Sequence, residues 1–385
     1  MGGVSMEWKE VTLGEIAIFK TGKLNSNAAI SNGEYPFFTC SPETLRINSY
    51  AFDQEAILLA GNNAEGNFSI KYYKGKFNAY QRTYVITPIR GKVDIKFLYY
   101  ALSLCLKQLK NMSQGTSTKF LTVTILNSFS VQLPSISDQR RIASILSSLD
   151  RKIELNNKIN ADLEEMAQAI FKNWFVDFEP FKDGKFVDSE LGMIPEGWKV
   201  GTLGDITKNK SAKVKERNDV KVLSPVTTGE LVLSEEYFTK QVFSSSIAKY
   251  KIVNKGDFAY NPARVNIGSL GRNEFDFDGC VSPVYVVFSV LDGYENYFDL
   301  FRKTDFFKDS VASLAIGGVR QSLSYDDLSL IETIIPSENI VEKFNNLYNQ
   351  MKKTIKANKL ENSRLSLLRD TLLPRLMSGE IEIPE

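Results

Sequence analysis

The sequence contains no histidine in 385 residues. Without an imidazole there can be no Ser-His-Asp or Cys-His catalysis, no HExxH zinc site and no histidine proton shuttle. A metal enzyme would have to bind its ion with carboxylates, and acyl transfer would need an unusual base such as lysine. The absence therefore argues against several classes of enzyme before any motif is considered.

Cysteine, net charge and long apolar runs are also scarce. The three cysteines (Cys40, Cys105 and Cys280) are far apart, so neither a disulfide framework nor a Cys-x-x-Cys metal pair is expected. The formal net charge is +1, so the overall charge does not indicate a polyanionic partner. No apolar run approaches the roughly 20 residues that span a bilayer, and residues 1–10 lack the apolar core of a signal peptide. We expect a cytoplasmic protein with reduced thiols, no metal site and no membrane partner.

A duplication organises the chain. The segment Trp8–Ile16 (WKEVTLGEI) recurs as Trp198–Ile206 (WKVGTLGDI) with an offset of 190 residues. Leu133-Pro-Ser recurs as Ile335-Pro-Ser with an offset of 202, so the second copy carries about 12 extra residues between these anchors. The repeated unit is therefore a large one, and not a short solenoid repeat.

Each copy has a globular part followed by a helical part. Short β-type runs and turn residues predict an α+β domain of about 130 residues in each copy. Strands are expected at 56–60, 83–87 and 284–288, and helices at 95–109 and 297–311. The expected boundaries are 7–135 for the first domain, 136–180 for the first helix, 181–336 for the linker and second domain, and 337–378 for the second helix.

The helical parts carry a heptad seam with asparagines in its middle. Apolar residues alternate at spacings of four and three from Ile142 to Ile170, and again 202 residues later from Phe344 to Leu372. In an antiparallel pair the facing positions have a constant sum of residue numbers, and 518 matches asparagine with asparagine and apolar with apolar residues. The asparagines that would set this register are Asn156, Asn160, Asn358 and Asn362. The alternatives are a parallel pair, or exposed asparagines on helices that bind other proteins.

An antiparallel seam predicts a rod with the two domains at its ends, related by a pseudo-twofold axis. The seam is about 42 Å long at ~1.5 Å per residue. One turn of B-DNA is about 34–36 Å, so such a rod suits the reading of two separated half-sites on one duplex.

Catalytic motifs are present only as fragments. Asn261-Pro-Ala-Arg264 begins like the Asn-Pro-Pro-Tyr/Phe signature of adenine-N6 methyltransferases, but the second proline and the aromatic residue are absent. Glu7-Trp-Lys9 is half of a nuclease Glu-x-Lys pair, without the upstream Pro-Asp. No GxxxxGK[ST] phosphate-binding loop occurs. No catalytic residue and no cofactor is therefore expected.

Features that could touch DNA are better represented. Two loops at the same place in both copies combine glycine, hydroxyls and a cation, a composition suited to phosphate contacts, and arginine and glutamine can also contact base edges. Asparagines and arginines near glycines form further clusters, although asparagine is also a standard turn former. The candidates are Gln114, Gly115, Thr116, Ser117 and Lys119 in the first loop; Gly318, Arg320, Gln321 and Ser322 in the second; and Asn62, Asn63, Arg82 and Arg264 in the clusters. A plain polar loop is the alternative for each loop.

The local charge is weak for a DNA-binding protein. Residues 1–135 hold 14 Lys and Arg against 9 Asp and Glu, whereas residues 181–336 hold 19 against 22. A DNA-binding domain that acts alone is usually more basic. This charge balance fits a DNA-binding protein that shares its phosphate contacts with other subunits.

The order of these pieces resembles the specificity (S) subunit of Type I restriction-modification systems. The matching segments are Leu13-Gly-Glu-Ile16, Gln139-Arg-Arg-Ile-Ala143, Phe171-Lys-Asn-Trp-Phe175, Leu191-Gly-Met-Ile-Pro-Glu-Gly-Trp198, Gly317-Gly-Val-Arg-Gln-Ser-Leu323 and Leu372-Leu-Pro-Arg-Leu-Met-Ser-Gly379. Together they cover essentially the whole chain.

The resemblance implies a non-catalytic subunit, present as a single copy in its complex. Each of two target recognition domains would read one half of a bipartite site in double-stranded DNA. The helices would form the coiled coil and dock two modification (M) subunits, with Trp174 and Phe175 as docking candidates and core packing as the alternative for both. Methyl transfer would occur on the M subunits, and translocation and cleavage on restriction (R) subunits.

Two other hypotheses remain open. One is a divergent, self-sufficient adenine-N6 DNA methyltransferase that uses Asn261, which S-adenosylmethionine binding by the isolated chain would support. The other is a coiled-coil scaffold with no nucleic-acid role, which sequence-independent or absent DNA binding would favour.

Overall fold

The computed structural model describes residues 7–238, 240, 242–314 and 322–381. The chain divides into two compact units, each of which contains one globular domain and part of two long helices. Unit 1 consists of residues 1–158 and 358–385, and unit 2 of residues 159–357. The predicted fold class, α+β domains joined to two long helices, is confirmed.

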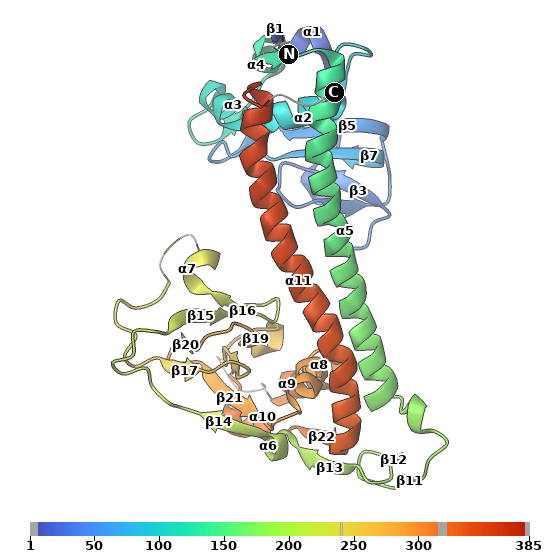
Figure 1. Ribbon diagram of the computed structural model, residues 1–385, viewed down its shortest axis with the longest axis vertical. Helices are drawn as coiled ribbons and strands as arrows, with labels where there is room; N and C mark the ends of the chain where they lie inside the picture. The colour runs from blue at the N-terminus through green and yellow to red at the C-terminus, as the bar shows by residue number, and fades with distance from the viewer. Residues whose placement is uncertain (1–6, 239, 241, 315–321, 382–385) are drawn as a thin grey trace, which may run out of the picture. The chain divides into compact units, whose positions relative to one another are not determined.

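A six-stranded sheet forms the centre of the globular domain in unit 1 (Figure 1). Neighbouring strands are antiparallel except β3 and β7, which are parallel. In spatial order the strands are β2 (Ala17–Thr21), β8 (Thr83–Pro88), β5 (Phe52–Ala60), β7 (Ile70–Ala79), β3 (Tyr35–Phe38) and β4 (Leu45–Ile47).

Both faces of this sheet are covered, because alternate residues of β5 are apolar on either side. Ile57 and Leu59 join the core that contains Phe97 of α2 (Ile95–Leu104), whereas Leu58 packs with Phe77 in a second, smaller cluster. This alternation follows from the period of two along a strand. A strand buried on both faces reads as the continuous apolar run that the sequence shows there.

The domain of unit 2 is built from two four-stranded sheets. Their strands are antiparallel except for the parallel pair β15–β20. The first sheet has the order β14 (Thr207–Lys210), β21 (Val286–Val290), β18 (Phe258–Tyr260) and β19 (Leu270–Arg272); the second has the order β16 (Leu231–Leu233), β15 (Lys221–Pro225), β20 (Gly279–Val281) and β17 (Lys251–Val253).

Strand register shows where the second copy gained its extra residues. In unit 1, β8 pairs on one side with β2, which follows Leu13-Gly-Glu-Ile16, and on the other side with β5 at Ile57. In unit 2, β21 pairs in the same way with β14, which follows Leu203-Gly-Asp-Ile206, and with β18 at Phe258. The chain advances 40 residues from Ala17 to Ile57 but 51 residues from Thr207 to Phe258. Nearly all of the insertion therefore lies in this one stretch, which in unit 2 carries β15, β16 and α7 (Ser234–Tyr237).

Two 40-residue helices, α5 (Ile136–Phe175) and α11 (Glu338–Met377), follow the two domains. A short antiparallel strand pair precedes each helix: β1 (Lys9–Thr12) with β10 (Ser130–Leu133), and β13 (Lys199–Thr202) with β22 (Glu332–Ile335). In unit 1, Asp150 meets Arg369 and Asn156 meets Asn362, so the two helix segments run antiparallel there.

Several element boundaries differ from the sequence prediction. The expected helix at 95–109 is broken at Cys105 into α2 and α3 (Leu106–Met112), and the one at 297–311 is divided into α8 (Glu295–Phe301) and α9 (Asp305–Leu314). The strand expected at 284–288 is β21, which begins two residues later because Val284 lies in an exposed turn. Helix α5 begins at Ile136, where the Oγ of the preceding Ser135 accepts a hydrogen bond from the Asp138 amide.

Within the described residues, neither long helix nor any shorter one combines the length and hydropathy that a bilayer crossing requires.

Candidate nucleic-acid interface

In unit 1, strand pairing joins two candidate clusters that are far apart in the sequence. Asn62 and Asn63 form β6, which pairs antiparallel with β9 (Lys119–Phe120), so that Asn63 lies opposite Lys119. The amide of Gly61 donates to the carbonyl of Arg82 at 2.8 Å, which places the exposed Arg82 beside them. These residues form one surface, which we call the unit 1 loop surface: 61–67, Arg82, Lys110 and 114–119.

The loop 114–119 is a tight hairpin. Gln114 and Phe120 exchange two backbone hydrogen bonds, at 3.0 and 2.9 Å. Gly115 has a φ of +96°, and a Cβ there would overlap the carbonyl oxygen of Thr118. Only glycine fits this position. The hairpin leaves Thr116 and Ser117 exposed at its tip, while Gln114 is exposed and Lys119 half-buried at its base.

Asparagines of this surface mostly serve the turn itself. The Oδ1 of Asn63 accepts from the amides of Glu65 and Asn67, at 2.9 and 3.0 Å. The Nζ of Lys110 donates to the Oδ1 of Asn67 at 2.9 Å. Lys110, on α3, was not among the predicted residues, although its place on the helix just before the loop was a signal. The unit 1 loop surface thus presents Arg82, Lys110 and Lys119 as cations, with exposed hydroxyls beside them.

Unit 2 repeats this arrangement with different side chains. The Leu323 amide donates to the carbonyl of Pro262 at 3.1 Å, just as the Leu121 amide donates to the carbonyl of Gly61 at 2.8 Å. Register equates Gly61 with Pro262, so Arg264 occupies the position of Asn63. Arg264 and Ser322 are exposed, whereas Gly318, Arg320 and Gln321 lie outside the described residues.

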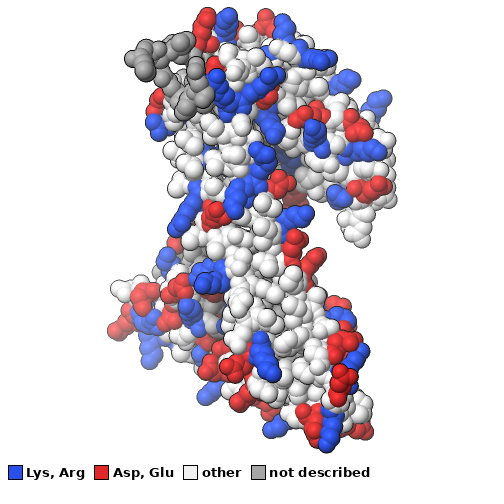
Figure 2. Space-filling view, turned by 45° about the vertical axis from the view of Figure 1, so that its right-hand side comes forward, with Lys and Arg blue, Asp and Glu red and all other residues white. Residues whose placement is uncertain are grey.

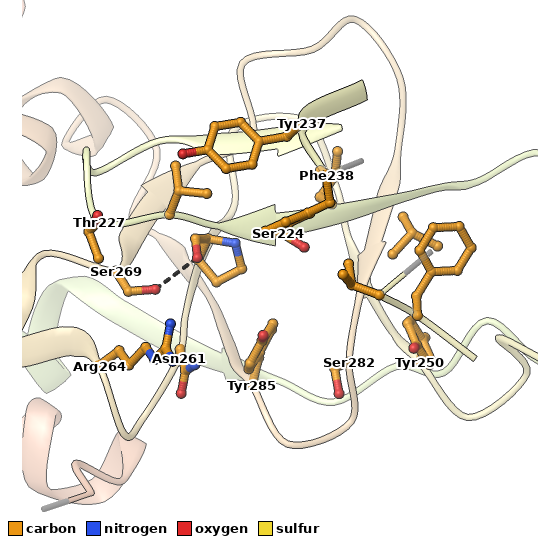
Figure 3. Close-up of a pocket in the computed structure, with 16 residues that line it drawn as sticks. Ser224, Thr227, Tyr237, Phe238, Tyr250, Asn261, Arg264, Ser269, Ser282 and Tyr285 are labelled. Atoms are coloured by element: carbon orange, nitrogen blue, oxygen red, sulfur yellow. Dashed lines mark hydrogen bonds between the residues drawn. The ribbon is translucent and has the colours of Figure 1, made fainter. Parts of the chain in front are cut away.

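A pocket of about 300 Å³ opens beside Arg264 (Figure 3). Ser224 and Pro225 of β15 form its base, and Tyr237 and Phe238 face Arg264 and Tyr285 across it. Asn261 also lines it; its Oδ1 accepts from the Ala263 amide at 3.0 Å, which is a turn contact. No sequence pattern indicated this pocket, because its walls come from five separate stretches of chain: 222–227, 237–243, Tyr250, 261–269 and 282–285.

The structure brings Asn156 and Asn362 together in unit 1. Asn156 is 1 % exposed, and its Nδ2 donates to the Oδ1 of Asn362 at 2.9 Å and to Glu361 at 2.7 Å. Asn362 donates in turn to Asn157 at 2.8 Å. The hydrogen bond from Asn156, together with Lys152, lowers the pKa of Glu361. Register reasoning missed Asn157 and Glu361, since neither lies on the seam.

The other two seam asparagines fall in different units and are described separately. Asn160, in unit 2, is 6 % exposed, and Asn358, in unit 1, is half-buried. Their pairing stays a prediction.

Of the two docking candidates, Phe175 packs in a core. It is 4 % exposed, and its ring lies 5.1 Å from that of Phe344 and 5.8 Å from that of Trp198. A buried ring offers no surface to a partner, so the docking role proposed for Phe175 is wrong and the core-packing alternative holds. Trp174 is half-buried and packs against Phe181 and Phe344.

Comparison with known proteins gives consistent matches. Residues 6–165 match the family model described as the Type I restriction modification DNA specificity domain. The chain is 29 % identical to the Type I restriction enzyme EcoDI specificity subunit of Escherichia coli, over 99 % of this chain and 90 % of that protein. It is also 29 % identical to the MjaIX specificity subunit of Methanocaldococcus jannaschii, over 78 % and 72 % of the two chains.

A solved structure shares the fold. The crystal structure of the Type I restriction-modification system S subunit from M. genitalium superimposes with a TM-score of 0.63 at 16 % identity, over 97 % of both chains. These matches make the chain similar, over nearly its whole length, to specificity subunits of Type I restriction enzymes, and the duplicated architecture and the solved structure agree with that similarity in fold.

Proposed function

We propose that this chain is the non-catalytic DNA sequence-specificity subunit of a Type I restriction-modification complex, and that each of its two domains reads one half of a bipartite site. The observation that carries the proposal is the repetition of one loop framework with different side chains. The same strand register presents Asn63 in one domain and Arg264 in the other. A common framework with altered side chains is what two readers of two different sequences need.

The domain limits proposed are 7–135 and 181–336, with helices 136–180 and 337–378 between and after them. The strand pairs β1–β10 and β13–β22 close each domain at its junction with the following helix. The DNA-contacting residues proposed are those of the unit 1 loop surface and, in unit 2, Arg264 and Ser322 together with Gly318, Arg320 and Gln321. The helices would set the distance between the half-sites.

Two modification subunits would dock on the long helices, and restriction subunits would join through them. Figure 2 shows an uncharged area along the helices in its lower half. Met166 on α5 and Leu368 on α11 are related by the seam offset of 202 residues, and both remain exposed, at 50 % and 46 %. An apolar position that recurs in both copies suits two copies of one partner, so these residues replace Phe175 as docking candidates.

Domain exchange tests the reading of half-sites. The chain is expressed with its modification partner, and methylated bases are mapped by single-molecule sequencing. Replacing residues 181–336 with the corresponding region of another specificity subunit should change one half of the methylated site and leave the other half as it was. Exchange of residues 7–135 is the matched control and should change the opposite half. If both halves stay unchanged in the first exchange, the proposal is wrong.

The methyltransferase alternative receives no support from the relatives, which are specificity subunits by name. The Oδ1 of Asn261, the residue on which that alternative rests, accepts a local turn hydrogen bond. The scaffold hypothesis is separated from the main proposal by the same exchange experiment, because a scaffold would not change the methylated sequence.

A further inference from the structure

The pocket in unit 2 has a composition that suits one class of ligand. Among the described residues that line it, aromatic rings are frequent, Arg264 is the cation, and no carboxylate is present. Arg264 forms no ion pair with any described residue. An unneutralised guanidinium beside aromatic rings favours a ligand that combines a flat ring with a negative charge. A single nucleotide has both parts.

The polar groups in the pocket can also address a base. The hydroxyl of Ser282 and the Nδ2 of Asn261 donate to no other described residue. Burial raises the pKa of Tyr285, although Arg264 opposes this, so the phenol stays protonated at neutral pH and can donate. These donors lie on the side of the pocket that Arg264 occupies, opposite Tyr237 (Figure 3).

The pocket lies beside a residue that the proposed function places in contact with DNA. Arg264 lines the pocket and also holds the position that Asn63 occupies in the unit 1 loop surface. The pocket walls formed by β15 and α7 belong to the stretch that holds the insertion of the second copy. The pocket therefore lies partly in the stretch in which unit 2 has 11 more residues than unit 1 (51 against 40).

We propose that this pocket accepts one nucleotide turned out of the bound duplex, with its base against Tyr237 and Tyr285 and its phosphate at Arg264. The proposal rests on the DNA-reading function proposed above and adds a second mode of reading to it. A base is selected by the pocket after it leaves the stack, and the cost of unstacking is offset by contact with aromatic rings. The pocket volume lies at the lower end of the range for ligand sites, so one nucleotide fits and a longer stretch of strand does not.

The test uses the full chain in complex with its modification partner and duplexes that carry the mapped site. One abasic position at a time is placed opposite each base of the half-site that residues 181–336 read. At the position whose base is turned out, affinity should rise about tenfold, because the abasic partner has already removed the cost of opening the pair. At positions read within the stack, affinity should fall or stay the same.

Two variants tie the gain to the pocket. Ser282→Trp fills the cavity, and Arg264→Gln removes its cation; each should abolish the tenfold gain. Ser245→Trp, at an exposed site outside the pocket, is the matched control and should keep it. Because Arg264 is exposed, Arg264→Gln tests the proposal even if the larger substitution disturbs folding.

The outcomes separate this inference from the function on which it depends. Sequence-specific binding of the intact duplex with no abasic gain at any position would overturn the pocket inference alone. A gain that survives in both pocket variants would do the same, as would binding of free deoxynucleoside monophosphates at the pocket without any abasic gain. Loss of all sequence preference by the unmodified complex would instead contradict the proposed function.

Discussion

A buried ion pair attaches the domain of unit 2 to its helix, and removing one charge should destabilise the unit strongly. Asp299 on α8 is 5 % exposed, and its Oδ1 accepts two hydrogen bonds from Arg302, at 2.7 and 3.0 Å. Its Oδ2 accepts a hydrogen bond from the hydroxyl of Tyr348 on α11 at 3.2 Å. Arg302 also donates to the carbonyls of Leu270 and Gly229. The pair therefore ties a helix, a strand and a turn together.

The substitution Asp299→Asn keeps the shape and leaves the buried guanidinium without its counter-charge. Such a change costs about 3–5 kcal/mol. For a unit of this size about 2–4 °C is lost per kcal/mol, so the melting temperature of unit 2 should fall by roughly 10 °C. Asp305→Asn is the matched control: it breaks an exposed pair of the same spacing with Lys308 and should have no measurable effect.

Acid dependence gives a second readout of the same pair. Burial would raise the pKa of Asp299, but Arg302, Lys303 and Lys352 outweigh it and hold the pKa below its ordinary value. The stabilisation is therefore complete above the unfolded pKa of about 3.9 and is lost as the pH falls through the lower folded pKa. The difference in melting temperature between wild type and Asp299→Asn should be constant above about pH 5 and shrink below it. Calorimetry that finds Asp299→Asn as stable as Asp305→Asn, or a difference that grows on acidification, would refute the reasoning.

Two further predictions concern the seam and the hairpin. Asn156→Leu alone should lower the free energy of unfolding by about 1–3 kcal/mol, because Asn362 and Glu361 lose their hydrogen-bond donor. The double variant Asn156→Leu with Asn362→Leu should restore or exceed the wild-type free energy of unfolding. Thermal melting checks both variants, and a double variant less stable than the single one would contradict pairing across the seam. Gly115→Ala should reduce methylation of the mapped site at least tenfold, because the added Cβ would displace the 114–119 hairpin. Gly91→Ala is the control: Gly91 also has a positive φ, but an added Cβ meets open space there, so methylation should not fall. Equal effects of the two substitutions would show that backbone strain alone is responsible.

Periodic features were predictable because they depend on local spacing. The seam repeats every seven residues, and Ile142, Leu146 and Phe344 are fully buried as that spacing predicts. The duplication likewise appears as a constant offset between anchors. Helix breaks were not predictable from spacing, since the apolar period continues through Cys105 while the backbone turns there.

Features built by long-range pairing could not be read from the sequence. Asn63 and Lys119 were two separate candidates until β6 and β9 joined them across 56 residues of chain. Phe175 was predicted to dock a partner but is buried, because an aromatic residue near a helix end has the same sequence signature whether it packs in a core or lies on a binding surface. Only the position of the ring relative to Phe344 and Trp198 separates the two.

The asparagine pair shows why a correct register still left the contact incomplete. Facing positions were derived from the sum of residue numbers, which treats each helix as a line and finds only Asn362 opposite Asn156. Side chains beside the seam are placed by the width of the helices, so Glu361 and Asn157 complete the hydrogen bonds of that pair. The buried amide is thus tied to a half-exposed carboxylate that also pairs with Lys152. A register device connected to surface charge can be adjusted by substitutions at the surface without any change in the apolar seam.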